Sequence, residues 1–124
     1  MARVIKFSIP EHGWIDLQIG EGKDQVNYCF SDVGPDTIGE FVSAKESIEQ
    51  ANRISTIECY LEPSVARIEI TPSAEEVTIN VDLDDTHVKT FVFPRNEFCR
   101  ILSGEIEKLI PLCCNPHWTH VNWC

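Results

Sequence analysis

Basic residues are scarce in this sequence. Its 124 residues include 10 Lys and Arg against 20 Asp and Glu, which gives a formal net charge of −10 at pH 7. Nucleic acids and anionic membranes are bound by basic surfaces, so the deficit excludes both as direct partners. No apolar run approaches the roughly 20 residues that span a bilayer. The N-terminus also lacks the apolar core of a signal peptide. We therefore expect a cytoplasmic protein.

Several motifs of catalysis and metal binding are absent as well. The sequence contains no GxSxG, no HExxH, no CxxC and no Gly-rich phosphate loop. It does contain six cysteines, of which Cys29, Cys59 and Cys99 lie in apolar periodic segments. Unpaired cysteine packs as a small hydrophobe. We predict reduced thiols, no catalytic residue, no cofactor and no small-molecule substrate. A nucleophilic pair of Cys99 with His87 is an alternative that the sequence leaves open.

Alternating apolar and polar residues, separated by turn residues, predict seven strands joined mostly by hairpin-length loops. These strands cover residues 4–9, 14–19, 25–30, 56–62, 65–71, 76–83 and 87–93. Apolar residues at helical spacing predict helices over 36–53 and 95–110.

The order βββαββββα predicts an α+β fold, in which an antiparallel sheet of about seven strands has both helices packed on one face. We divide the chain into a single α+β domain over 1–112 and a Cys/His/Trp-rich C-terminal tail over 113–124. Simple alternation would place His87 and Lys89 on the same face of the last strand as Phe91 and Phe93.

The segment Asp82-Leu83-Asp84-Asp85-Thr86 matches the DxDxT signature of haloacid-dehalogenase-type phosphatases. There the first Asp is the nucleophile and the second is the acid/base. That family also needs a parallel doubly wound sheet and further catalytic residues, whereas only one strand and one helix are expected after Thr86. A hairpin turn explains the same residues, because Asp favours turns. A hydrolase that uses Asp82, Asp84 and Asp85 remains the alternative function.

The tail contains two thiols and two imidazoles, a ligand set that zinc accepts. They are spaced as Cys113-x3-His117-x2-His120-x3-Cys124, which matches no standard zinc motif. We predict no metal; if one is bound, these four residues are its ligands, and a small metal-binding protein is the corresponding alternative.

Negative charge is concentrated in the centre of the sequence. Residues 56–86 hold eight acids and Arg67 alone as a base. A surface of one sign speeds encounter with a partner of the opposite sign and excludes wrong partners. We therefore predict a surface for a basic partner, formed by Glu75, Glu76, Asp82, Asp84 and Asp85.

The segment Phe7-Ser8-Ile9-Pro10-Glu11-His12-Gly13-Trp14-Ile15 is distinctive. It resembles the opening of a group of short bacterial proteins, and the later Phe93-Pro94 followed by an amphipathic helix is similar too. Some small acidic α+β proteins of this kind act as immunity proteins in contact-dependent growth inhibition and related polymorphic toxin systems.

The resemblance implies a non-catalytic protein that binds and neutralises a cognate toxin domain. A nuclease is the expected class of toxin, since a nuclease must be basic to hold a phosphate backbone. The resemblance carries over no binding residues. An assembly module without a toxin is a further alternative.

Overall fold

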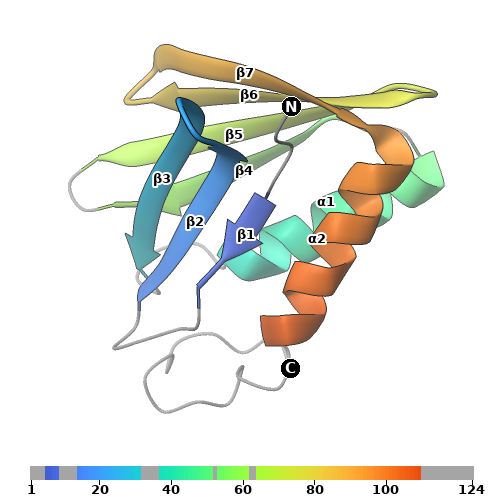
Figure 1. The fold of residues 1–124 in the computed structure, drawn as a ribbon, viewed down its shortest axis with the longest axis horizontal. Coiled ribbons are helices and arrows are strands. Elements are labelled where there is room, and N and C mark those ends of the chain that lie inside the picture. The colour runs from blue at the N-terminus through green and yellow to red at the C-terminus, as the bar shows by residue number, and fades with distance from the viewer. Residues whose placement is uncertain (1–4, 9–13, 32–36, 52, 62–63, 110–124) are drawn as a thin grey trace.

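Seven strands and two helices follow one another in the order βββαββββα, which confirms the predicted α+β fold (Figure 1). The structure is a computed structural model that describes residues 5–8, 14–31, 37–51, 53–61 and 64–109. The strands are β1 (Ile5–Phe7), β2 (Trp14–Glu21), β3 (Asp24–Ser31), β4 (Ser55–Tyr60), β5 (Val65–Pro72), β6 (Glu76–Leu83) and β7 (Thr86–Pro94). The helices are α1 (Thr37–Ala51) and α2 (Arg95–Leu109).

The strands form two antiparallel sheets rather than a single one, in the orders β1-β2-β3 and β4-β5-β6-β7. Helix α1 separates β3 from β4 in the chain, so no hairpin turn sets their pairing. Alternation along a strand tells which side chains are buried but not which strand is the neighbour across a helix. The strands of the smaller sheet run across those of the larger one (Figure 1).

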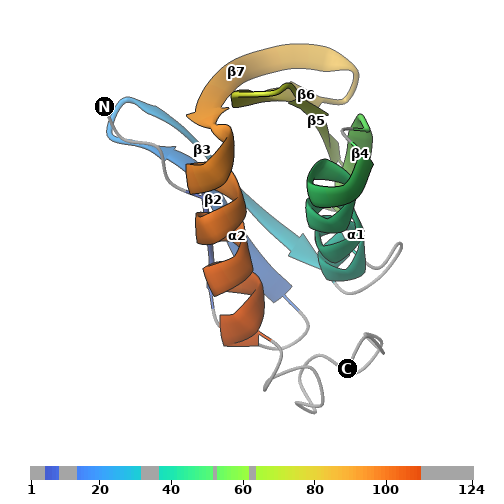
Figure 2. The ribbon, with the colours of Figure 1, turned by 90° about the vertical axis from the view of Figure 1, so that its right-hand side faces the viewer.

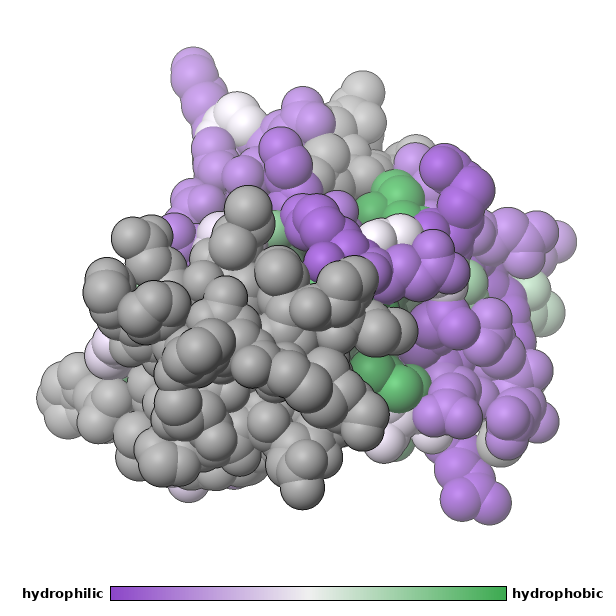
Figure 3. Space-filling model, turned by 90° about the horizontal axis from the view of Figure 1, so that it is seen from below, coloured by the Kyte–Doolittle hydropathy of each residue, from purple (hydrophilic) through white to green (hydrophobic). Residues whose placement is uncertain are grey.

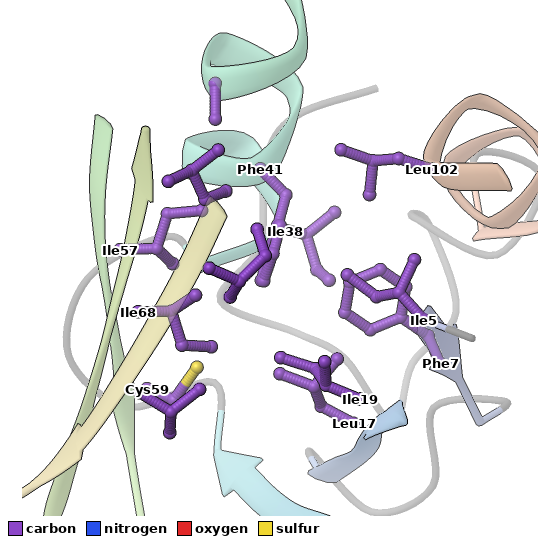
Figure 4. Packing of buried hydrophobic residues seen from close by; sticks show 14 of the residues in the cluster. Ile5, Phe7, Leu17, Ile19, Ile38, Phe41, Ile57, Cys59, Ile68 and Leu102 are labelled. Carbon is purple, nitrogen blue, oxygen red and sulfur yellow. The ribbon is translucent and has the colours of Figure 1, made fainter. Parts of the chain in front are cut away.

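One hydrophobic core lies between the two sheets and is completed by both helices. Both helices lie on the same side of the four-stranded sheet, as predicted (Figure 2). Figure 4 shows side chains from both sheets and both helices pointing toward one another. Phe7 and Phe41 meet edge to face with ring centroids 5.1 Å apart. The helices contribute residues at the predicted spacing: Ile38, Phe41, Ala44, Ile48, Phe98, Leu102, Ile106 and Leu109.

Helix α1 also covers part of the edge of the four-stranded sheet. The Thr37 hydroxyl donates a hydrogen bond to the carbonyl oxygen of Glu58 on β4 (2.8 Å), and the backbone N–H of Glu58 donates to the Glu40 carboxylate (3.2 Å). Both backbone groups of Glu58 therefore have partners, although β4 is an edge strand within the described residues.

Helix α2 does the same for the edge of the three-stranded sheet. The backbone N–H of Phe7 donates to the Glu105 carboxylate (2.7 Å), and the Lys108 ammonium donates to the carbonyl oxygen of Phe7 (2.7 Å).

No helix in the described part of the chain is long and apolar enough to cross a membrane. Seen from below, on the side where the helices lie, most of the described surface is hydrophilic, with small separate hydrophobic patches (Figure 3).

Strand β7 contains a one-residue bulge. Val81 is opposite Lys89, but Asp82 is opposite His87, so Val88 has no partner on β6. A bulge changes which face the following side chains occupy. His87 consequently lies on the outer face of the sheet beside Asp82, while Lys89 lies on the core side. The placement of these two residues on one face, as expected from simple alternation, was wrong for this reason.

The core side of β7 supports the tip of the β2–β3 hairpin. The Lys89 ammonium forms an ion pair with Asp24 at 2.8 Å. Gly20, with a positive φ of 86°, lies directly against the Phe91 ring. These contacts join the two sheets where no backbone pairing connects them.

Candidate partner-binding surface

The helices and the smaller sheet lie on one side of the four-stranded sheet, and no described element covers the other side (Figure 2). We call this other side, together with the β6–β7 turn, the outer face. The side chains that alternate with buried core residues along the four strands project from it. Its acidic members are Glu58, Glu69, Glu76, Asp82, Asp84 and Asp85, and it also carries Arg67 and His87. Six carboxylates thus accompany a single guanidinium.

Arg67 lies among the acids at the end of the outer face that is formed by the β6–β7 turn. Its Nη1 donates to Asp85 at 2.8 Å, and its Nη2 donates to Glu58 at 3.4 Å. The hydrogen bond that Arg67 donates to Asp85 is the largest of the causes that raise the pKa of Arg67. The guanidinium and all its partners are well exposed, so these pairs contribute little to stability. Their effect is to hold the carboxylates of Glu58 and Asp85 on either side of a fixed cation.

A shallow hollow opens at this point. It has a volume of about 270 Å³ and is lined by Glu58, Tyr60, Val65, Arg67, Asp84 and Asp85. Three of its six lining residues are acids. A lysine or arginine side chain from a partner would find carboxylates on several sides here, and the Tyr60 ring offers an apolar wall.

Asp84 and Asp85 form the tight turn between β6 and β7. Both have positive φ, 48° and 66°, as a two-residue hairpin of type I′ requires. The Asp84 carboxylate accepts a hydrogen bond from the backbone N–H of Val65 (3.0 Å). This bond, followed by one from Ser64, lowers the pKa of Asp84. The Asp84 side chain therefore ties the turn to the start of β5, which is a structural role that its acidity alone did not predict.

His87 joins a polar network across the bulge. Its Nδ1 lies 3.3 Å from the Asp82 carboxylate, and its Nε2 lies 3.2 Å from the Thr90 hydroxyl. The Thr90 hydroxyl donates to the side-chain oxygen of Asn80 at 2.7 Å. Because a hydroxyl has one proton, the Thr90 oxygen accepts from His87 in this arrangement. In this arrangement Nε2 of His87 donates to Thr90, and the imidazole ring partly covers Asp82, the least exposed carboxylate of the turn region.

The five predicted partner-binding acids fall into two groups. Asp82, Asp84 and Asp85 lie together at one end of β6, whereas Glu75 and Glu76 lie at the other end, beside the β5–β6 turn. Asp82 is six residue steps of extended strand from Glu76, or about 20 Å. One compact acidic patch is therefore not formed. The two groups are instead the ends of one long polar surface.

Sequence reasoning left Glu58 and Glu69 out of the predicted site, although both belong to the same acidic segment. Glu58 faces Arg67, and Glu69 faces Asn80, in the strand register. The alternation in the predicted strands 56–62 and 65–71 already indicated that both point away from the core. The omission came from weighing charge along the chain rather than across neighbouring strands.

The DxDxT match lies in an antiparallel context. Strand β6 pairs antiparallel with β5 and with β7, and Asp84 and Asp85 occupy the hairpin turn. The parallel sheet that the phosphatase signature requires is not present in the described residues. Nor do any three His, Cys, Asp or Glu side chains of that part of the chain converge so that they could hold a metal ion. The tail ligands Cys113, His117, His120 and Cys124 lie outside the described residues.

The three described cysteines are unpaired thiols. Cys59 is buried in the core, and burial strongly raises its pKa. Cys29 is exposed on β3, where desolvation and then Asp16 raise its pKa to about 11. Cys99 is partly buried on α2, and burial raises its pKa too. The structure does not bring Cys99 to His87, since seven strand residues, about 23 Å, separate His87 from the start of α2.

Comparisons with protein-family models, curated proteins and solved structures gave no match for this chain.

Proposed function

We propose that this chain is a non-catalytic immunity protein of the cytoplasm, which binds a basic toxin domain through the outer face and blocks its active site. A nuclease is the expected class of toxin. The observation that carries the proposal is the charge of the outer face, where six carboxylates and one guanidinium lie on a surface that no described element covers. The N-terminal resemblance supports the same function.

The physical argument concerns charge complementarity. A nuclease active site carries cations that hold the phosphate backbone. An acidic surface about 20 Å long presents carboxylates at spacings comparable to several phosphates. Exposed ion pairs are individually weak, so the main benefit is a faster encounter and rejection of acidic competitors. A protein whose carboxylates take the place of the phosphates in this way needs no catalytic group of its own.

The test uses the toxin domain encoded by the neighbouring gene, in a catalytically inactive form. Glu76→Lys and Asp82→Lys together reverse one charge at each end of the outer face. Asp84 and Asp85 stay unchanged because their positive φ angles disfavour a lysine. We expect association at low salt to slow about tenfold or more, with a weaker dependence on salt.

The control variant combines Glu46→Lys on α1 with Glu107→Lys on α2. Both positions are exposed, and the change in net charge is the same. Co-expression with the active toxin provides the second readout, because the wild-type chain should restore growth. If both double variants bind like the wild type, the outer face is not the contact. If the wild-type chain neither binds nor protects, the chain is not the immunity protein of that toxin.

A further inference from the structure

The edge of β4 that faces away from β5 is covered along only part of its length. In an antiparallel pair, the backbone groups of every second residue point away from the partner strand. Those of Glu58 do so, because they bond to Thr37 and Glu40. The same alternation directs the N–H and C=O of Thr56 to this edge. No side chain of the described residues covers them there, in contrast to those of Glu58.

A groove lies next to this uncovered stretch. It runs between α1 and β4, has a volume of about 630 Å³, and is lined by Gly39, Glu40, Ser43, Ala44, Ser55 and Thr56. Most of these side chains are small, so the backbone of β4 is accessible from the groove. The volume falls within the range of sites that hold a small ligand or a short peptide segment.

The surroundings of the groove indicate what could enter it. Ile54, the residue before β4, is 62% exposed and is the most exposed large hydrophobic residue among those that the structure describes. Glu69 is opposite Thr56 in the register and belongs to the acidic outer face, and Glu40 lines the groove itself. A backbone donor and acceptor, an apolar side chain and nearby carboxylates together suit an extended segment with basic residues.

We propose that this groove receives an extended, basic segment of the toxin domain, which pairs with Thr56 and adds a strand to the edge of β4. Main-chain hydrogen bonds supply affinity in such complexes, and pockets for alternate side chains supply specificity. The inference rests on the proposed function and deepens it, because it names a second contact that is continuous with the outer face. The toxin would then contact both the outer face and the edge of the same sheet.

The sharpest test removes one backbone donor. Thr56→Pro deletes the N–H that points into the groove and leaves the pairing with β5 intact, since proline is accepted on strand edges. Its reference is Thr56→Ala, which loses the same side chain but keeps the N–H. The Kd ratio of the two variants therefore reports the loss of the N–H together with the constraint of the proline ring. We expect Thr56→Pro to bind the inactive toxin domain about tenfold more weakly than Thr56→Ala.

A second variant fills the groove without altering β4. Ser43→Phe places a ring in the groove, while Gln50→Phe adds the same ring to an exposed site of α1 outside it. We expect only Ser43→Phe to weaken binding. Hydrogen exchange of the wild-type chain needs no variant, and the amide of Thr56 should exchange more slowly in the complex.

The outcomes separate the two proposals. Slower exchange at Thr56 with loss of binding in Thr56→Pro and Ser43→Phe supports strand addition. Unchanged exchange at Thr56, or equal affinity of Thr56→Pro and Thr56→Ala, refutes strand addition. If the wild-type chain still binds the toxin domain in that case, the proposed function stands. Absence of binding by the wild-type chain refutes both.

Discussion

Replacing Gly20 tests how the two sheets are held together. Gly20 lies at the tip of the β2–β3 hairpin with φ of 86°. A Cβ atom at this position would lie 2.6 Å from Cε1 of Phe91 on β7 and even closer to the carbonyl oxygen of Asp24. Real Cβ atoms essentially never approach that closely, so Gly20→Ala must disturb both the backbone of the hairpin tip and its contact with Phe91.

Gly22 provides a matched comparison in the same turn. Its φ is also positive, 62°, but a Cβ atom there would meet nothing within 4 Å. Both alanine variants therefore carry the cost of a left-handed backbone, about 1–2 kcal/mol. Only Gly20→Ala adds an overpacking cost, about 1–3 kcal/mol. We expect a loss of about 1 kcal/mol in the free energy of unfolding for Gly22→Ala and about 3 kcal/mol for Gly20→Ala.

The assay is urea unfolding followed by tryptophan fluorescence and circular dichroism. Phe91→Leu in the Gly20→Ala background should recover part of the loss, because it relieves the contact with the ring but not the contact with the Asp24 carbonyl. Equal losses in the two glycine variants would contradict the described crowding at Gly20, and no recovery with Phe91→Leu would contradict the packing of the hairpin tip against β7.

Three further predictions concern titration, thiol reactivity and metal. Asp84→Asn, which keeps the positive φ accessible, should lower stability at pH 7. Because the folded-state pKa of Asp84 is lowered, the difference from the wild type should begin to shrink as the pH falls through about 4 and be lost below the folded-state pKa. Urea melts at pH 7 and pH 3 measure this, and an equal difference at both would contradict the role of the Val65 bond. Cys29, with a pKa of about 11, should react with iodoacetamide at pH 8 about a hundredfold more slowly than a thiol of pKa 9. Asp16→Asn should raise the rate at Cys29, and mass spectrometry of the peptide that contains Cys29 measures this rate. Chelator should leave the melting temperature unchanged; one zinc per chain with a large drop in melting temperature would assign Cys113, His117, His120 and Cys124 as ligands.

Much of the fold was predictable because its signals are local. The alternation Val77, Ile79, Val81 set the strand 76–83, and its bounds agree with β6. The apolar stripe that contains Phe98 and Leu102 predicted α2 to within one residue at its end. Each of these patterns is a direct consequence of one buried face with a fixed period.

The features that the sequence did not predict depend on contacts between distant segments. The bulge at Val88 is set by the pairing of β7 with β6 and by the position of Lys89 near Asp24, 65 residues away in the chain. The division into two sheets has a similar cause. Because α1 lies between β3 and β4 in the chain, no short turn decides whether β4 pairs with β3 or starts a separate sheet. The candidate site was predicted incompletely for the same reason. Glu58 and Asp82 become neighbours of Arg67 only through the register of the strands.

The edges of the sheets support the assignment of the β4 groove. Exposed strand edges invite unwanted pairing, and proteins protect them with bulges, inward charges, proline or covering elements. Strand β7 has a bulge at Val88, an inward Lys89 and a terminal Pro94, and β1 is covered at Phe7 by α2. Strand β4 is protected at Glu58 alone. Among these three edge strands, β4 leaves the backbone groups of Thr56 without a covering side chain of the described residues, beside a groove of small side chains, and this is the position that the proposed pairing would use.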